Sequence, residues 1–275
     1  MLFLTKDEHR IVLDRLVTLG KSITGVPTHD AGIEFTSLLS CFHLHCIGAA
    51  QSILALETQF GSEWFPTTTG YIIARSIFEV DVTSHYIALD PTNRSRQYID
   101  FEKVILKNKL EAVERNLTSP NVSWKEGAML EFQNYWAPKK ASIDAEYSLI
   151  SSQFEVGGKR VRNWSGKSLY GMAKAVDHVE AYESYYSDLS SFAHVDVMMA
   201  NRFLRNDGLS KGDGPAWSMR AEEGDVGKVY LYADTFLTCF LMLLGKEFKF
   251  WDDKKVLECW NFPEAAGRES KITRK

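Results

Sequence analysis

Apolar residues recur every three to four positions along almost the whole chain, whereas the strict alternation typical of β-strands is nearly absent. This spacing lines up apolar side chains along one face of an α-helix. We therefore expect an all-α protein that folds as a single multi-helix bundle. One helical domain is expected to span residues 1–275, with its core at about residues 32–204 and a C-terminal core helix at 225–248.

Capping and helix-breaking residues predict where several helices begin and end. Thr5-Lys-Asp-Glu8 has the form of a capping box, in which two side chains bind free N–H groups at the start of a helix. Asp90-Pro91 is expected to stop a helix that runs from about residue 68 to 89. Pro138 is expected to interrupt a long helix over about residues 123–153, because proline lacks a backbone N–H.

The composition narrows the function classes. Hydrophobic residues make up 45% of the chain and charged residues 25%, as in ordinary soluble proteins. A net charge of −4 provides no overall attraction to nucleic acid or to a membrane surface. Four irregularly spaced cysteines suit a reducing compartment. The first ten residues turn charged too early for a signal peptide, and the apolar run at 229–244 falls short of a membrane span. We expect a cytoplasmic protein.

A charged pair interrupts the apolar helix that precedes Asp90. Arg75 and Glu79 are four residues apart and therefore lie on one helix face. One interpretation is a surface ion pair worth about 0.3–0.5 kcal/mol. The other is a partly buried pair placed for use, because Arg can bind a phosphate or carboxylate in a bidentate manner. Tyr86, near the end of this helix, is a further candidate ligand-binding residue.

A second polar pair lies on a helix expected over about residues 176–204. Ser190 precedes His194 by one helical turn, and a tyrosine stripe that includes Tyr186 lies on the same helix. A neutral histidine can act as a general acid or base near neutral pH. The plainer interpretation is a hydrogen-bonded structural histidine beside tyrosines that pack in the core. We expect the two polar pairs to converge in one pocket.

A basic segment with a central tryptophan lies in a loop expected over residues 156–167. Cations beside an exposed aromatic ring can hold phosphates and stack on a base. The alternative is a solvated loop that its tryptophan anchors to the protein body. The candidate ligand-binding residues are Lys159, Arg160, Arg162, Trp164 and Lys167.

The sequence predicts neither a metal centre nor a cofactor. Cys41-Phe-His-Leu-His-Cys46 contains metal-ligating residue types, but only Cys41 and His45 share a helix face. The chain has no second cysteine and histidine cluster that would complete a tetrahedral set. Phosphate-binding loops, dinucleotide fingerprints and zincin motifs are also absent from the sequence.

Three motifs together resemble a bacterial family of helical domains of unknown function that is akin to AbiV-type abortive-infection proteins. They are Arg75-x-x-x-Glu79 followed by Tyr86, then Trp164-Ser-Gly-Lys-Ser168, and then Tyr182-x-x-Tyr185-x-x-x-Leu189-Ser190-x-x-x-His194. The resemblance runs from about Gly32 to Leu204. Wider relatives resemble HEPN-like helical bundles, many of which are metal-independent ribonucleases in defence or toxin systems. Those enzymes carry an Arg-x(4–6)-His motif, which this chain lacks.

Three hypotheses about function remain open at this point. The protein could cleave RNA without a metal, with His194 as acid or base, Arg75 stabilising the phosphorane, Glu79 orienting Arg75, and Ser190 beside them. It could bind a nucleotide or another small anion without catalysis. The same four residues could instead form a structural hydrogen-bond network in an interaction protein. A homodimer and an RNA or nucleotide partner are expected, whereas a membrane partner is not.

Overall fold

The computed structural model describes residues 4–23, 28–118, 122–194, 204–205, 216–217 and 222–262. For residues 122–124, 128, 192–194, 204–205 and 216–217 it describes the backbone alone. The described chain is almost entirely helical, which confirms the all-α prediction.

The chain divides into two compact units. Unit 1 comprises Met1–Tyr86 and Ala173–Lys275, and unit 2 comprises Ile87–Met172. Each unit has its own buried apolar residues. The sequence analysis expects one domain over residues 1–275. That the two units together form this one domain stays a prediction.

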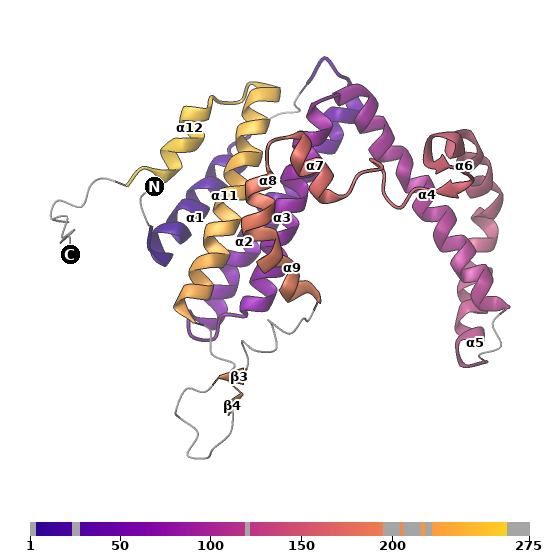
Figure 1. The fold of residues 1–275 in the computed structure, drawn as a ribbon, viewed down its shortest axis with the longest axis horizontal. Coiled ribbons are helices and arrows are strands. Elements are labelled where there is room, and N and C mark those ends of the chain that lie inside the picture. The colour runs from indigo at the N-terminus through magenta and orange to yellow at the C-terminus, as the bar shows by residue number, and fades with distance from the viewer. Residues whose placement is uncertain are drawn as a thin grey trace. The chain divides into compact units, whose positions relative to one another are not determined.

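Unit 1 is built on long helices that lie side by side (Figure 1). Two of these helices contact each other through aromatic rings. The ring centroids of Phe78 in α3 and Phe236 in α11 are 4.7 Å apart. The long helices are α1 (Lys6–Lys21), α2 (Ile33–Phe60), α3 (Thr67–Ala88) and α11 (Glu223–Phe248). Shorter elements complete the described part of unit 1: α8 (Val179–Ala181), the π-helix η3 (Tyr182–Tyr186), α9 (Ser187–His194), β3 (Leu204–Arg205), β4 (Ala216–Trp217), α12 (Asp253–Leu257) and the 3₁₀ helix η4 (Glu258–Trp260).

The predicted start of α1 is confirmed in detail. The Glu8 N–H donates to Thr5 Oγ1 at 3.3 Å, and the Thr5 N–H donates to Glu8 Oε2 at 2.7 Å. This reciprocal capping satisfies two N–H groups that have no partner within the helix.

Helix α11 is the central helix of unit 1. Fourteen of its residues are buried. Both α2 and α11 are long and apolar enough to span a membrane, judged by length and composition alone. Helix α11 extends the apolar run at 229–244 at both ends, and the expectation that this run does not span a membrane stays a prediction. With 67% of its most apolar window buried, α11 also has the burial of a core helix in a soluble protein.

The helix expected over residues 176–204 is shorter and less regular than predicted. Its described part runs from α8 through η3 to the end of α9 at His194. Leu204 does not belong to a helix, because it pairs with Trp217 in a two-residue antiparallel ladder. Most of the glycine-rich segment that follows lies outside the described residues.

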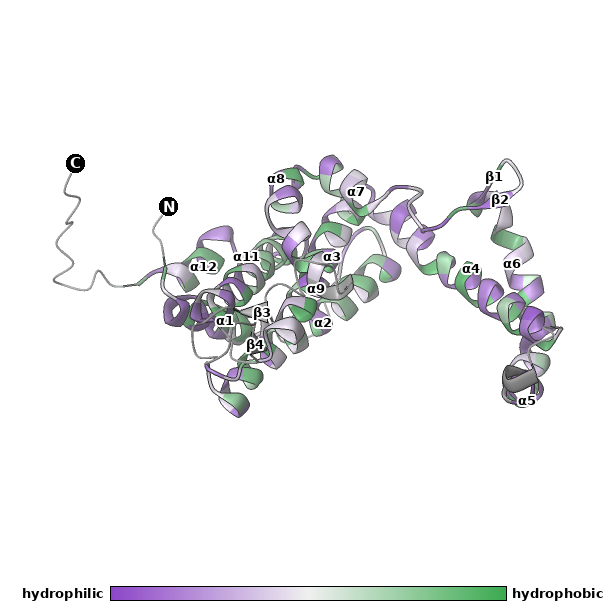
Figure 2. Ribbon diagram, turned by 60° about the horizontal axis from the view of Figure 1, so that its bottom comes forward, coloured by the Kyte–Doolittle hydropathy of each residue, from purple (hydrophilic) through white to green (hydrophobic). Residues whose placement is uncertain are grey.

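Unit 2 is a smaller helical body with two clusters of buried apolar side chains. One cluster contains Val104, Tyr147, Ile150 and Phe154, and the other contains Leu110, Trp136 and Ile143. In Figure 2, helix α4 alternates green and purple along its length, as expected for a helix with one apolar face. The elements are α4 (Pro91–Leu117), α5 (Val122–Glu131), the π-helix η1 (Phe132–Trp136), the 3₁₀ helix η2 (Ala137–Lys139), α6 (Lys140–Phe154), β1 (Glu155–Val156), β2 (Lys159–Arg160) and α7 (Leu169–Ala175), which continues into unit 1.

Pro138 breaks the helical run of unit 2 as predicted, because it lies in η2 between η1 and α6. The segment at 156–167 differs from the expected plain loop. Its first residues form a tight hairpin in which Val156 pairs with Lys159. Gly157 and Gly158 make this turn at φ values of 59° and 72°, a conformation that favours glycine.

Candidate functional site

The structure brings two candidate residues to the Arg75 side chain, Glu79 from the same helix and Tyr186 from a segment far along the chain. The Arg75 Nε donates to Glu79 Oε1 at 2.7 Å, and its Nη2 donates to the Tyr186 hydroxyl at 2.8 Å. Ser190 follows Tyr186 by one helical turn and acts to lower the pKa of the Tyr186 hydroxyl. We call Arg75, Glu79, Tyr186 and Ser190 the Arg75 cluster. It joins α3 to η3 and α9 within unit 1.

The Arg75 cluster is neither fully buried nor freely exposed. The side chain of Arg75 is 18% exposed and that of Glu79 is 42% exposed. Tyr186 and Ser190 are half-buried. The Arg75–Glu79 pair is therefore more than a surface salt bridge. Arg75 Nη2 also donates a hydrogen bond to the Tyr186 hydroxyl, which orients the guanidinium.

Tyr186, which contacts Arg75, is the last residue of the π-helical turn η3. The wider turn of a π-helix brings residues four apart nearly into line. Tyr182 and Tyr186 stack accordingly, with ring centroids 4.6 Å apart and an interplanar angle of 18°. The Arg75 guanidinium carbon also lies 5.0 Å from the centroid of the Tyr186 ring. Burial raises the pKa of Tyr186, so its hydroxyl stays protonated.

Two other candidates are placed differently. His194 is the last residue of α9, one turn beyond Ser190, and its side chain lies outside the described residues. The predicted approach of His194 to Arg75 therefore stays a prediction. Tyr86 is buried on α3 eleven residues after Arg75, or about 16 Å along the helix at 1.5 Å per residue. It does not belong to the Arg75 cluster.

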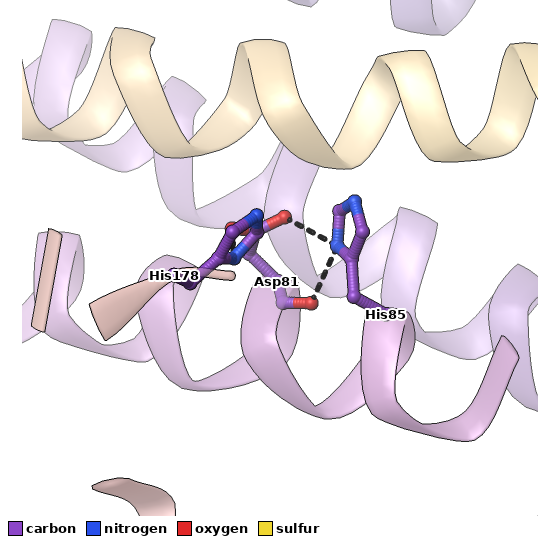
Figure 3. Close-up of side chains that lie close together, drawn as sticks. All are labelled: Asp81, His85 and His178. Carbon is purple, nitrogen blue, oxygen red and sulfur yellow. Dashed lines mark hydrogen bonds and ion pairs between the residues drawn. The ribbon is translucent and has the colours of Figure 1, made fainter. Parts of the chain in front are cut away.

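A second polar cluster on α3 was missed by the sequence analysis. Asp81, His85 and His178 each offer one ligand atom, and these atoms lie within 4.8 Å of one another (Figure 3). Asp81 is 1% exposed, and the two histidines are half-buried. We call these residues the Asp81 cluster. The sequence shows only part of this cluster. Asp81 and His85 are four residues apart and share a helix face, whereas His178 is remote in sequence.

The two imidazoles of the Asp81 cluster have opposite pKa shifts. Burial acts to lower the pKa of His85, but the Asp81 carboxylate outweighs it, and the net shift is upward. Burial lowers the pKa of His178. The ring centroids of the two histidines are 4.7 Å apart.

A comparison with known protein families shows to which family the chain belongs. Residues 36–212 match a family of unknown function, DUF5677. The chain belongs to this family. The match confirms the expected membership in a helical family of unknown function, and it covers every residue of both clusters. No match was found among curated proteins or among solved structures.

In this DUF5677 protein, the basic segment lies in unit 2. Among the described residues, side-chain contacts hold two of its five candidates, Arg160 and Trp164. Both Nη atoms of Arg160 donate to the Glu111 carboxylate at 2.7 Å, and its Nε donates to the Tyr147 hydroxyl at 2.8 Å. Trp164 is 8% exposed, and its ring meets that of Tyr98 edge-on at 5.2 Å. These contacts match the alternative of an anchored loop.

The other three basic-segment candidates, Lys159, Arg162 and Lys167, are exposed. Their role in binding a ligand stays a prediction.

Replacing Arg160 with alanine is expected to destabilise unit 2 by about 1–3 kcal/mol, since a bidentate pair and a hydrogen bond are lost together. Lys159→Ala, in the same hairpin, is the matched control and should change the free energy of unfolding by less than about 0.5 kcal/mol. Urea denaturation followed by circular dichroism measures both. Equal effects of the two variants would contradict a structural role for Arg160.

Proposed function

We propose that this protein binds a phosphate-bearing ligand, a nucleotide or RNA, at the Arg75 cluster. The observation that carries the proposal is the way Arg75 is held. Glu79 and Tyr186 fix two edges of a guanidinium that still reaches solvent. A fixed planar guanidinium loses little freedom when it binds a phosphate, and its geometry matches two phosphate oxygens.

The chemistry of the described residues favours binding over proton transfer. Tyr186 has a raised pKa, so its hydroxyl keeps its proton and does not act as a base. The hydroxyl accepts a hydrogen bond from Arg75, and its own O–H can donate to a ligand. Glu79 is engaged by Arg75 at 2.7 Å and serves to orient it. Proton transfer at this site would therefore rest on His194.

RNA cleavage without a metal at the cluster is the second candidate function. It is supported by the position of His194 at the end of α9, one turn beyond Ser190. In this scheme His194 moves the proton, and Arg75 stabilises charge on the phosphorane. The resemblance to AbiV-type and HEPN-like proteins supports a role in phage defence or toxicity. A cytoplasmic location and a homodimer are part of the same proposal.

Binding is tested with the full chain, using fluorescently labelled single-stranded RNA and a panel of unlabelled nucleoside triphosphates as competitors. Arg75→Gln and Tyr186→Phe are expected to weaken binding by about tenfold to 100-fold, as for the loss of hydrogen bonds to a charged group. Arg96→Gln is the matched control, because Arg96 is 75% exposed and its only described ion pair is at 4.0 Å. It should bind like the wild type.

Two outcomes would reject the proposal. If neither RNA nor any nucleotide binds to the wild type, or if Arg75→Gln binds as well as the wild type, the cluster is not a phosphate site. A sharp fall in melting temperature in Arg75→Gln with unchanged binding would instead support a structural network. Cleavage of the labelled RNA, and its loss in His194→Ala, decides between binding alone and catalysis.

A further inference from the structure

We propose that Asp81, His85 and His178 form a binding site for a divalent first-row transition metal ion of the Zn²⁺ class. Two imidazole nitrogens and one carboxylate oxygen are a ligand set that such ions accept. This site is separate from the Arg75 cluster, and the proposal does not depend on phosphate binding there.

The distances fit a coordination shell. In tetrahedral geometry, metal–ligand bonds of about 2.0–2.1 Å place neighbouring ligand atoms about 3.3–3.4 Å apart. His85 Nδ1 lies 3.1 Å from Asp81 Oδ1, and His178 Nδ1 lies 3.4 Å from Oδ2, the other oxygen of the same carboxylate. With one ligand atom taken from each residue, the three atoms lie within 4.8 Å of one another. Figure 3 shows the two imidazole rings beside the Asp81 carboxylate. An ion could be accommodated with small side-chain adjustments.

The buried carboxylate supplies a second, independent observation. Asp81 is 1% exposed, and its Oδ1 accepts no hydrogen bond from the residues that the structure describes. His85 Nδ1 makes its hydrogen bond to the Asp81 backbone oxygen, at 3.0 Å, and lies 3.1 Å from Oδ1 as an ion pair. A metal ion would take the place of the proton on this nitrogen, and the hydrogen bond would be given up. A buried carboxylate oxygen without a hydrogen bond is costly, and coordination to a cation would remove that cost.

The backbone holds the three ligands from two segments. Asp81 and His85 are one turn apart on α3, so they face the same side. His178 directly precedes α8 and follows Asp177, whose φ of 58° lies in the left-handed region. This conformation is unusual for a residue other than glycine. It accompanies a sharp turn after α7, in which the His178 N–H donates to the Ala173 oxygen at 2.9 Å.

Three protein ligands leave at least one coordination position for water or a substrate, as in catalytic zinc sites. His85 also lines a surface hollow of about 400 Å³ together with Lys246 and Asp252, which provides space for a small molecule near the cluster. Cys46 and Cys239 are close enough to Asp81 for its charge to act on their thiols. Burial, however, raises the pKa of both thiols and so disfavours the thiolate form that binds metals.

A bound ion would tie α3 to the start of the segment that leads through η3 to α9. Because this segment carries Tyr186 and Ser190, the metal would be expected to hold the second half of the Arg75 cluster in place. The competing interpretation is a cluster held by its hydrogen bond and ion pairs alone.

The experiment uses the full chain after dialysis against a chelator, with Zn²⁺ and Co²⁺ as probes. Equilibrium dialysis with elemental analysis should give one tightly bound ion per chain, and Co²⁺ should show the visible absorption of a site with nitrogen ligands. His178→Gln and Asp81→Asn should each weaken binding by more than about tenfold. The double variant Cys41→Ser/His45→Gln removes the other pair of metal-ligating residues on one helix face and should bind like the wild type.

Thermal denaturation provides a second readout. Zn²⁺ should raise the melting temperature of the wild type and of Arg75→Gln, but not that of His178→Gln. If Asp81→Asn does not fold, His178→Gln carries the test, since its side chain is 20% exposed. Absence of a tightly bound ion in the wild type, or equal affinity in His178→Gln, would show a hydrogen-bonded cluster only and overturn the proposal.

Discussion

Replacing Phe78 with alanine is expected to lower the free energy of unfolding by about 3–5 kcal/mol, as for other buried phenylalanines. Phe78 is fully buried in unit 1, and its ring lies 4.7 Å from Phe236 and 5.7 Å from Tyr186 between centroids. The substitution leaves a cavity where α3, α11 and η3 meet. Such a junction cannot collapse easily, because three elements would have to move together.

Chemical denaturation measures this effect through the transition midpoint and the slope m. Ile72→Ala is the matched control, because Ile72 lies on the same helix and is 45% exposed. It should change the free energy of unfolding by no more than about 0.5 kcal/mol. A loss of less than about 1 kcal/mol in Phe78→Ala would contradict the packing described for unit 1.

The second large effect concerns a carboxyl group in the core of unit 1. Asp234 of α11 is fully buried, and its Oδ2 lies 2.8 Å from His9 Nδ1. Burial raises the pKa of Asp234 from 3.8 to about 7, although His9 acts to lower it. Because the folded state binds this proton more tightly than the unfolded state, folding is favoured where the carboxyl is protonated.

The stability that Asp234 contributes should therefore be complete below about pH 4 and lost as the pH rises through about 7. A shift of one pKa unit corresponds to about 1.4 kcal/mol, so the upper limit is about 4 kcal/mol. Urea denaturation of the wild type between about pH 5 and 8 should show the unfolding free energy falling with pH.

Asp234→Asn is the control for this pH dependence, because asparagine keeps the shape and cannot ionise. The difference between the two pH slopes therefore reports Asp234 together with its hydrogen-bonded partner His9. Parallel slopes would show that the carboxyl titrates at its ordinary pKa despite its burial.

The sequence predicted the helices well where a local signal defined their ends. Thr5 and Glu8 form the expected capping box, and Pro138 interrupts the run in unit 2 as expected. The prediction failed at Leu204, which lies in a strand pair with Trp217. Apolar periodicity cannot exclude this pairing, because the partner residue lies well beyond the segment that is being read.

Among the candidate residues, too, contacts between near neighbours in sequence were predictable, whereas contacts with remote residues were not. Arg75 and Glu79 pair as their spacing predicts, because one helical turn separates them. The role of Trp164 and Arg160 as anchors depends on Tyr98 and Glu111, which precede them by more than forty residues. No local pattern in the basic segment distinguishes an exposed arginine from one that a remote carboxylate holds.

The sequence by itself determined the helical class of this protein and the face of α3 that carries Arg75 and Glu79, since both follow from periodicity within one helix. Only the tertiary structure decided which remote residues complete the two clusters. Tyr186 contacts Arg75 from a π-helical turn, and His178 reaches Asp81 after a left-handed residue. Such contacts depend on the packing of helices that are far apart in the chain, which spacing along the sequence does not encode.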